Sequence, residues 1–172
     1  DLAARGAIDG EITARAIDYM RRQTKTRQPF FLFLPYTQPH MPLTAAPEFA
    51  GKTRNGEFAD VLAQIDAYTG RLLDEVDRLG IRDNTIVIYI FGDNGASAEG
   101  QNGTISELLA QNGIPNTVEQ QMAALEKIGG LDALGGPKTD SMYHAGWAWA
   151  GNTPFRHTKL VASHFGGTRN PM

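Results

Sequence analysis

Residues 85–95 read TIVIYIFGDNG, a β-branched and aromatic run that ends in two glycines flanking Asp93 and Asn94. The run Thr85–Ile90 has the composition of a strand buried on both faces, and the residues after it have the composition of a tight turn. Open α/β sheets bind their ligands just beyond the ends of such strands. The stretch therefore predicts a central strand that places Asp93 and Asn94 at a candidate site.

A second buried strand and two helices are predicted upstream of this stretch. Phe30–Leu34 is uniformly apolar and is bounded by prolines, as a short buried strand would be. Apolar residues recur at three- and four-residue steps in Ile8–Gln23 and in Glu57–Leu79, where Gly80 supplies the stop. A helix between two buried strands is typical of a βαβ crossover, so the order of elements indicates an α/β fold.

Downstream of the Asp93-Asn94 turn the chain becomes rich in glycine and loses most of its periodicity. We expect residues 96–152 to form a loop-rich insertion, with short helical pieces near Ile105–Leu109 and Val118–Ile128. Thr158–Ala162 is predicted to form a short third strand. The whole stretch 1–172 is interpreted as the central part of one domain.

Composition narrows the classes of function. The chain has 172 residues, 41% of them hydrophobic, and a formal net charge of −3, and a chain of this length buries about 70% of its unfolded surface. The lack of any Lys/Arg cluster argues against a nucleic-acid partner, and no apolar run has the length of a membrane span. The lack of cysteine excludes disulfides and thiolate zinc sites within these residues. The sequence assigns no cellular compartment.

Asp93 and Asn94 are adjacent hard-oxygen donors that suit Ca²⁺ or Mg²⁺. The alternative is an ordinary turn, because Asp-Asn-Gly is a common turn sequence. Calcium takes about six to eight oxygen ligands, so these two residues would supply only half of a site.

His40 and Lys159 are candidates for proton transfer and for anion binding. His40 follows Pro39 in a proline-rich loop just past the predicted Phe30–Leu34 strand, where an imidazole can be held rigidly over a pocket. Lys159 offers a compact positive charge that can neutralise an anionic oxygen. The alternatives are an incidental loop histidine and an ordinary exposed lysine.

The glycine-rich segment 143–149 combines His144, Trp147 and Trp149. These aromatic side chains suit the wall of a pocket for an organic group. The alternative, which the sequence slightly favours, is a small satellite core under a long loop. No phosphate-binding P-loop and no Gly-x-Ser-x-Gly motif occurs in the chain, so those mechanisms have no support.

The order of these motifs resembles the arylsulfatases of the alkaline-phosphatase-like superfamily, from about Pro29 onward. The resemblance rests on PFFLFLPY at 29–36 with Pro39-His40, on DNT at 83–85 leading to GDNGA at 92–96, and on TPFR at 153–156 with Lys159 and Gly166-Gly167. One departure is local: Gly166-Gly167 arrives one residue later after the lysine than the Glu-Gly-Gly of the family. His164, just before this pair, stays unassigned.

This resemblance implies a sulfuric ester hydrolase whose fold is a sandwich of helices around a central, mostly parallel sheet. It implies one Ca²⁺, with Mg²⁺ the lesser candidate, and a formylglycine nucleophile made from a Cys/Ser-x-Pro-x-Arg motif that this chain lacks. By position, Asp93 and Asn94 match the second pair of calcium ligands of the family. His40 matches the histidine that contacts the sulfate or the leaving-group oxygen, and Lys159 matches the sulfate-binding lysine.

In members of the family, the nucleophile and the first two aspartates lie before the region that matches this chain. We therefore expect the chain to be an internal fragment that needs the remainder of the same polypeptide and is inactive alone. Two alternatives stay open at this point. One is a phosphate or phosphonate ester hydrolase of the same superfamily, and the other is a non-catalytic module that binds a partner through Trp147 and Trp149.

Overall fold

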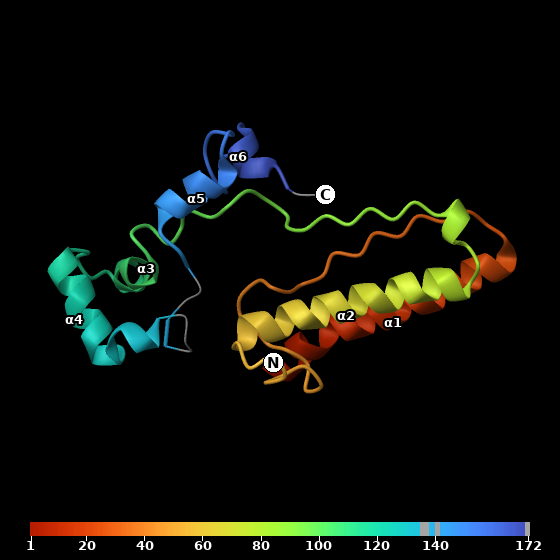
Figure 1. Ribbon diagram of the computed structural model, residues 1–172, viewed down its shortest axis with the longest axis horizontal. Coiled ribbons are helices and arrows are strands. Elements are labelled where there is room, and N and C mark those ends of the chain that lie inside the picture. Colours follow the sequence, from red (N-terminus) through yellow and green to blue (C-terminus); the bar gives the residue numbers. More distant parts are fainter. Residues whose placement is uncertain (135–137, 140–141, 171–172) are drawn as a thin grey trace. The chain divides into compact units, whose positions relative to one another are not determined.

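The computed structural model describes residues 1–134, 138–139 and 142–170. The chain divides into two compact units, Asp1–Val87 and Ile88–Met172, each with its own internal packing. Figure 1 shows the elements of both units coloured along the sequence.

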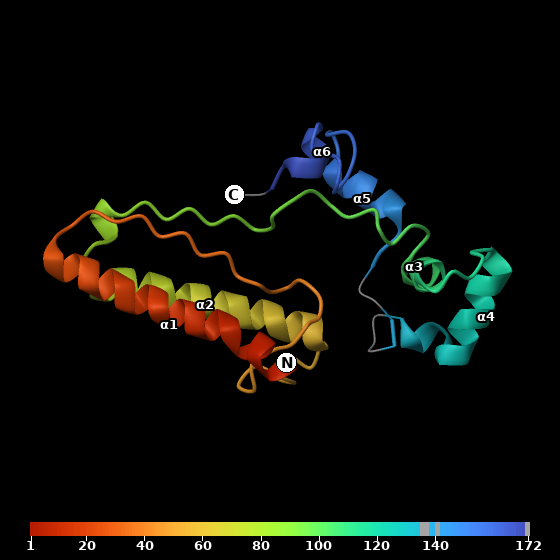
Figure 2. The same ribbon diagram turned by 180° about the vertical axis from the view of Figure 1, so that it is seen from behind.

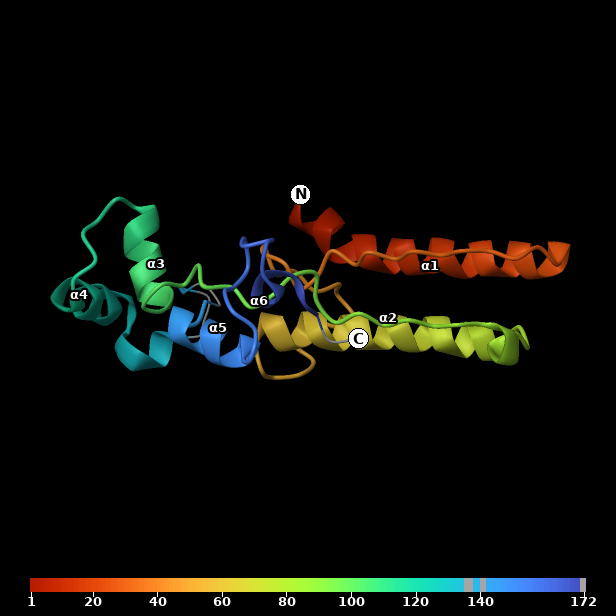
Figure 3. The same cartoon turned by 90° about the horizontal axis from the view of Figure 1, so that it is seen from above.

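The first unit is built on two long helices, α1 (Leu2–Thr26) and α2 (Glu57–Arg78), which pack lengthwise and run in the same direction (Figure 1). In the part of the sequence that connects α1 to α2, residues 29–36 run back in extended form alongside α1 (Figures 2 and 3). The short 3-10 helix η1 (Arg82–Asn84) follows α2. The buried apolar side chains on these two helices are Ala16, Met20, Val61, Ile65, Tyr68 and Val76.

Both predicted helices of this unit are confirmed. The predicted Glu57–Leu79 helix matches α2 almost residue for residue, and α1 extends the predicted Ile8–Gln23 helix at both ends. Asp1 caps α1 by accepting a hydrogen bond from the Ala3 N–H at 2.9 Å, which is why this helix begins earlier than its apolar periodicity does.

The three predicted strands are corrected by the structure. Phe30–Leu34 and Thr85–Ile90 are extended, but no strand ladder forms anywhere in the part of the chain that the structure describes, and Thr158–Ala162 consists mainly of turns. The Phe31 and Ile86 side chains are 85% and 89% exposed. The physical reason is that a strand exists only through hydrogen bonds to a neighbour, and no described segment supplies one to these residues. The predicted sheet is therefore not seen.

In its described residues, the second unit contains four α-helices: α3 (Thr104–Gln111), α4 (Val118–Ile128), α5 (Ala145–Asn152) and the single turn α6 (Phe165–Thr168). The 3-10 helix η2 (Gly130–Ala133) follows α4. Ile105, Leu109 and Leu125 form a small core between α3 and α4. The region 96–152 thus holds three of these helices, two of them at the predicted short periodic pieces.

Thr117 begins α4 with a capping box, in which its hydroxyl accepts from the Gln120 N–H and the Gln120 side chain accepts from the Thr117 N–H.

Of the helices in the described residues, none is both long and apolar enough to cross a membrane.

Candidate active site

The loop that carries His40 is held by side chains from α1. Asp9 is fully buried, and its two carboxylate oxygens accept hydrogen bonds from the Thr37 and Gln38 N–H groups at 2.9 and 3.1 Å. Arg5, one turn earlier, donates to the carbonyl oxygens of Thr37 and His40 at 3.0 and 2.8 Å. Charged groups make strong hydrogen bonds, so the main chain on both sides of Pro39 is anchored to one helix.

A second set of contacts fixes the far side of the same loop. The Gln64 side chain on α2 is fully buried; its Oε1 accepts from the Ala46 N–H at 2.7 Å and its Nε2 donates to the Gly6 carbonyl at 3.4 Å. Gln38 Nε2 donates to the Thr44 carbonyl at 3.1 Å. The loop is therefore tied to both helices of the first unit.

The His40 ring itself is exposed and has a defined tautomer. Its Nδ1 lies 2.9 Å from the Met41 carbonyl oxygen. A carbonyl only accepts hydrogen bonds, so Nδ1 carries a proton and Nε2 is the atom left to contact another molecule. In the neutral ring Nε2 accepts a proton, and in the imidazolium it donates one.

Asp93 and Asn94 follow the extended segment in the second unit. Asp93 is exposed, and the Asn94 Nδ2 donates to its Oδ1 at 2.6 Å, which leaves the Asn94 amide oxygen as a further donor atom for a cation. One carboxylate and one amide oxygen suit Ca²⁺ in chemistry but fall well short of its usual ligand number. Within the described residues no group of three or more His, Asp or Glu side chains gathers around a common point. The pair fits a metal site only as part of one.

Lys159 is brought next to the Asp93-Asn94 turn by main-chain contacts. The Lys159 N–H donates to the Ala96 carbonyl at 2.9 Å, and the Gly95 N–H donates to the Gly167 carbonyl at 3.0 Å. The structure therefore unites Asp93, Asn94 and Lys159 within one unit. His40 belongs to the first unit and is placed there by α1.

Asn152, which sequence reasoning missed, joins the segments of this arrangement. Its Oδ1 accepts from the Ala96 N–H at 3.1 Å, and its Nδ2 donates to the carbonyls of His157 and Gly166 at 3.0 and 2.8 Å. The available signal was its position, directly before the TPFR motif at 153–156. One amide group thus connects the Asp93-Asn94 turn to the segments on both sides of Lys159.

Three glycines allow these segments to approach closely. A Cβ atom on Gly95 would lie 1.7 Å from the Gly166 carbonyl oxygen, and one on Gly166 would lie 2.1 Å from the His157 carbonyl oxygen. A Cβ atom on Gly167 would lie 2.3 Å from the Val161 carbonyl oxygen. Only glycine permits main-chain contacts this close, so the Gly166-Gly167 pair has a packing role around Lys159.

The Lys159 ammonium pairs with Glu99. Its Nζ lies 2.8 Å from Oε2 of Glu99, with the two side chains 27% and 38% exposed. The sequence held no local signal for this pair, because the two residues are 60 positions apart.

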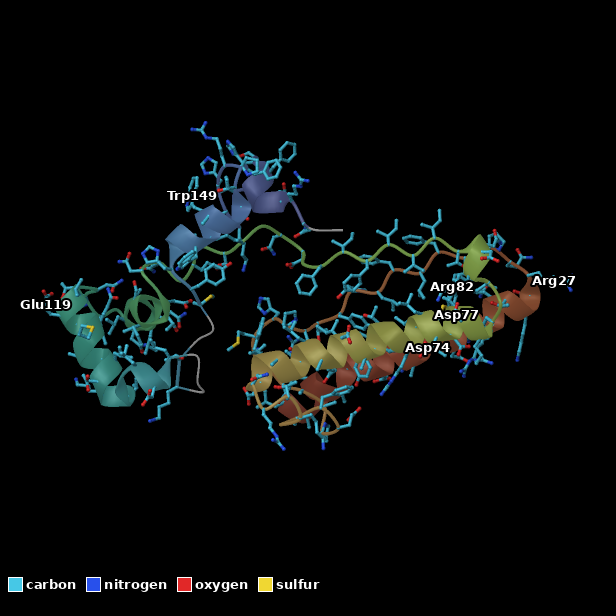
Figure 4. The ribbon with its side chains drawn as sticks, viewed as in Figure 1. Arg27, Asp74, Asp77, Arg82, Glu119 and Trp149 are labelled. Carbon is cyan, nitrogen blue, oxygen red and sulfur yellow. The ribbon has the colours of Figure 1, made fainter. Side chains whose placement is uncertain are left out.

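The aromatic residues of 143–149 belong to α5 and to the two residues just before it. Trp147 is 72% exposed, and the His144 ring caps α5 by accepting from the Gly146 N–H at 2.9 Å. Trp149 lies within α5 (Figure 4), with its ring centre 5.7 Å from that of His157. The His157 ring in turn contacts the unassigned His164, at a centroid distance of 4.0 Å.

A cavity of about 690 Å³ opens beside Asn94 in the second unit. Its aromatic lining comes from Phe91, Phe155 and Phe165, and Arg169 supplies a positive charge by lying over the Phe155 ring. Neither tryptophan of 143–149 lines this cavity.

Comparison with known proteins finds several sulfatases that are similar to this chain. The chain is 38% identical to steryl-sulfatase of Rattus norvegicus over 94 residues, which cover 54% of this chain and 16% of that protein. It is 35% identical to N-acetylgalactosamine-6-sulfatase of Canis lupus familiaris over 92 residues, covering 52% and 17%, and 33% identical to human arylsulfatase H over 88 residues, covering 51% and 15%. The matched region thus spans about one sixth of these relatives. No solved structure matches the chain.

The family model named Sulfatase matches residues 4–172, nearly the whole chain. This match covers both units, including the His40 loop and the Asp93–Lys159 arrangement. The chain belongs to the Sulfatase family.

Proposed function

We propose that this chain contributes part of the active site of a sulfuric ester hydrolase. The observation that carries the proposal is the hydrogen bond that holds Lys159 against the segment directly following Asp93 and Asn94, in a chain of the Sulfatase family. A sulfate ester presents three non-bridging oxygens and a departing alkoxide, so its hydrolysis needs positive charge and a proton at separate points.

The chain's own residues meet these needs in different ways. The Lys159 ammonium binds a non-bridging oxygen of the ester. The exposed Nε2 of His40, as imidazolium, donates a proton to the leaving-group oxygen, while the Nδ1–H stays on the Met41 carbonyl and keeps the ring oriented. Asp93 and Asn94 would hold two coordination positions of a Ca²⁺ ion, which when bound polarises the sulfate oxygens. The formylglycine nucleophile comes from a Cys/Ser-x-Pro-x-Arg motif outside these residues.

The same proposal assigns a place to the two extended segments. Residues 30–34 and 85–90 become neighbouring strands of the central, mostly parallel sheet of an alkaline-phosphatase-like fold. Their exposed apolar side chains support this assignment, because strands of such sheets are covered on both faces. The sulfate ester is the substrate class, and the remainder of the polypeptide supplies the other half of the metal site.

The test uses the protein in which this chain is joined to a formylglycine motif, assayed for sulfate release from an aryl sulfate. Replacing His40 or Lys159 by alanine should lower kcat/KM about 100-fold or more, because each removes charge or a proton at the reacting group. Lys127→Ala, at an exposed position of α4, is the matched control and should leave kcat/KM unchanged. A loss under about threefold for both active-site variants would remove the proposed roles.

A further inference from the structure

Resting on the proposed function, we infer that Glu99 is a positioning residue: it holds the Lys159 side chain in the orientation that binds the sulfate oxygen. The ammonium and the carboxylate form an ion pair of 2.8 Å across 60 positions of sequence. Both side chains are partly buried, so water screens the pair less than it screens a fully exposed one.

The carboxylate is oriented by its own segment before it meets the lysine. The Ser97 Oγ donates to Oε2 of Glu99 at 2.8 Å, the same oxygen that contacts Lys159, and the Glu99 N–H donates to the Ser97 Oγ at 3.2 Å. Glu99 therefore presents a fixed acceptor to the lysine, in the short turn that follows the candidate calcium ligands.

The lysine is held at both of its ends. Its main-chain N–H is bound to the Ala96 carbonyl at 2.9 Å, and its Nζ is bound to Glu99, three residues further along the same segment. A free lysine side chain samples many rotamers, and these two contacts restrict that sampling. Holding a group in its reactive orientation raises the reaction rate, because that group loses less conformational freedom when the substrate binds.

The ion pair with Glu99 leaves the Lys159 ammonium able to bind a sulfate oxygen. An ammonium group carries three N–H donors, and Glu99 uses one of them, so two remain for oxygens of a bound sulfate. In this inference Glu99 acts on the reaction through the Lys159 side chain that it contacts.

The first test measures the pair without any catalysis. The reactivity of each lysine toward a small acylating reagent is quantified by peptide mass spectrometry in the wild-type protein and in Glu99→Gln, which keeps the side-chain length and removes the charge. Labelling of Lys159 should rise about threefold or more in the variant, because the ion pair no longer holds the amine. Lys127 serves as the internal reference and Glu126→Gln, at an exposed position of α4, as the matched control variant. Unchanged labelling of Lys159 would overturn the inference.

The second test is a double-mutant cycle on aryl sulfate hydrolysis. Glu99→Gln should lower kcat/KM about 10-fold in the wild-type background and less than about twofold when Lys159 is already alanine, because a positioning residue has no effect once its target is gone. Equal losses in both backgrounds would show that Glu99 acts independently of Lys159, against the inference. A wild-type protein that hydrolyses no sulfate ester would overturn the proposed function instead, and the labelling result would still decide whether Glu99 holds Lys159.

Discussion

At the scale of single residues, Asn152 accepts one hydrogen bond from Ala96 and donates two, to the carbonyls of His157 and Gly166. Substituting Asn152 by alanine removes all three and should lower the free energy of unfolding by about 1–3 kcal/mol. Asn152→Asp keeps the acceptor but turns a carboxylate toward two carbonyl oxygens, so it should cost at least as much. Both are measured by urea unfolding.

The control for this pair is Asn102→Ala, at an exposed position of the same unit, which should change the free energy of unfolding by less than about 0.5 kcal/mol. If Asn152→Asp were as stable as the wild type, the two hydrogen bonds that Asn152 donates would make no contribution to the free energy of unfolding.

Gly95 makes the second prediction at this scale. A methyl group there would overlap the Gly166 carbonyl oxygen at 1.7 Å, so Gly95→Ala must push the two segments apart. We expect Gly95→Ala to lower the free energy of unfolding by about 1–3 kcal/mol. It should also lower kcat/KM although Lys159 is still present, because the lysine is no longer held in its position. Thermal unfolding and kcat/KM measure the two effects.

Gly70 is the matched comparison, since it lies within α2 and a Cβ atom there meets nothing within 4 Å. Gly70→Ala should stabilise the protein by about 0.5–1 kcal/mol, because alanine loses less freedom than glycine in a helix. Destabilisation by both glycine substitutions would mean that overlap at Gly95 is not the cause.

At the scale of elements, α1 and α2 are joined by a charged cluster around Glu75. Its carboxylate is buried and accepts from Arg78 on α2 and from Arg21 on α1, the latter through Nε and Nη2 at 2.9 and 3.0 Å. The hydrogen bonds from Arg78 and then from Arg21 lower the pKa of Glu75 to about 2 from its usual 4.5. Near the end of α2, Arg82 pairs similarly with Asp77 (Figure 4).

This pKa sets a pH dependence with a definite sign. Because the folded state lowers the pKa, the Glu75 carboxylate stabilises the protein above about pH 4.5, and that contribution is lost as the pH falls toward about 2. Glu75→Gln should cost about 1–3 kcal/mol near neutral pH, and the difference from the wild type should shrink on acidification. Urea unfolding at about pH 7 and about pH 3 measures it.

Asp74→Asn is the control, since the neighbouring Asp74 is exposed, and it should change the free energy of unfolding by less than about 0.5 kcal/mol at about pH 7. A cost for Glu75→Gln that stays constant down to about pH 3 would contradict the assignment of this pH dependence to Glu75.

At the scale of the whole molecule, both extended segments expose apolar side chains: Phe31 and Phe33 in one, and those of residues 86–91 in the other. No hydrogen bond between main-chain atoms joins residues 29–35 or 86–91 to another described residue. Unpaired, apolar extended segments associate with one another, so the chain studied by itself should self-associate as its concentration rises. Ile86→Lys, at a position 89% exposed, should reduce this association, which sedimentation velocity measures.

Leu131→Lys, in η2 and 74% exposed, adds the same charge at a site outside both segments and should leave the association unchanged. If Ile86→Lys and Leu131→Lys reduced the association equally, net charge and not strand pairing would control it.

The sequence by itself determined what is local. The helices over Ile8–Gln23 and Glu57–Leu79 follow from periodicity within a few turns, and the motifs around His40, Asp93 and Lys159 indicated the family that the comparisons then showed. The roles predicted for these residues remain predictions. The strands failed as predictions because extension is a local preference, whereas pairing requires a second segment.

Only the tertiary structure decided which distant groups meet. Asp9 holding the main chain beside Pro39, Asn152 joining Ala96 to Gly166, and Glu99 pairing with Lys159 all link residues between 14 and 60 positions apart. A sequence pattern specifies which face of an element is apolar, but the partner of a buried carboxylate or amide depends on how elements pack. Such hydrogen bonds exist only once the chain has folded, and their donors and acceptors carry no periodic signal along the sequence.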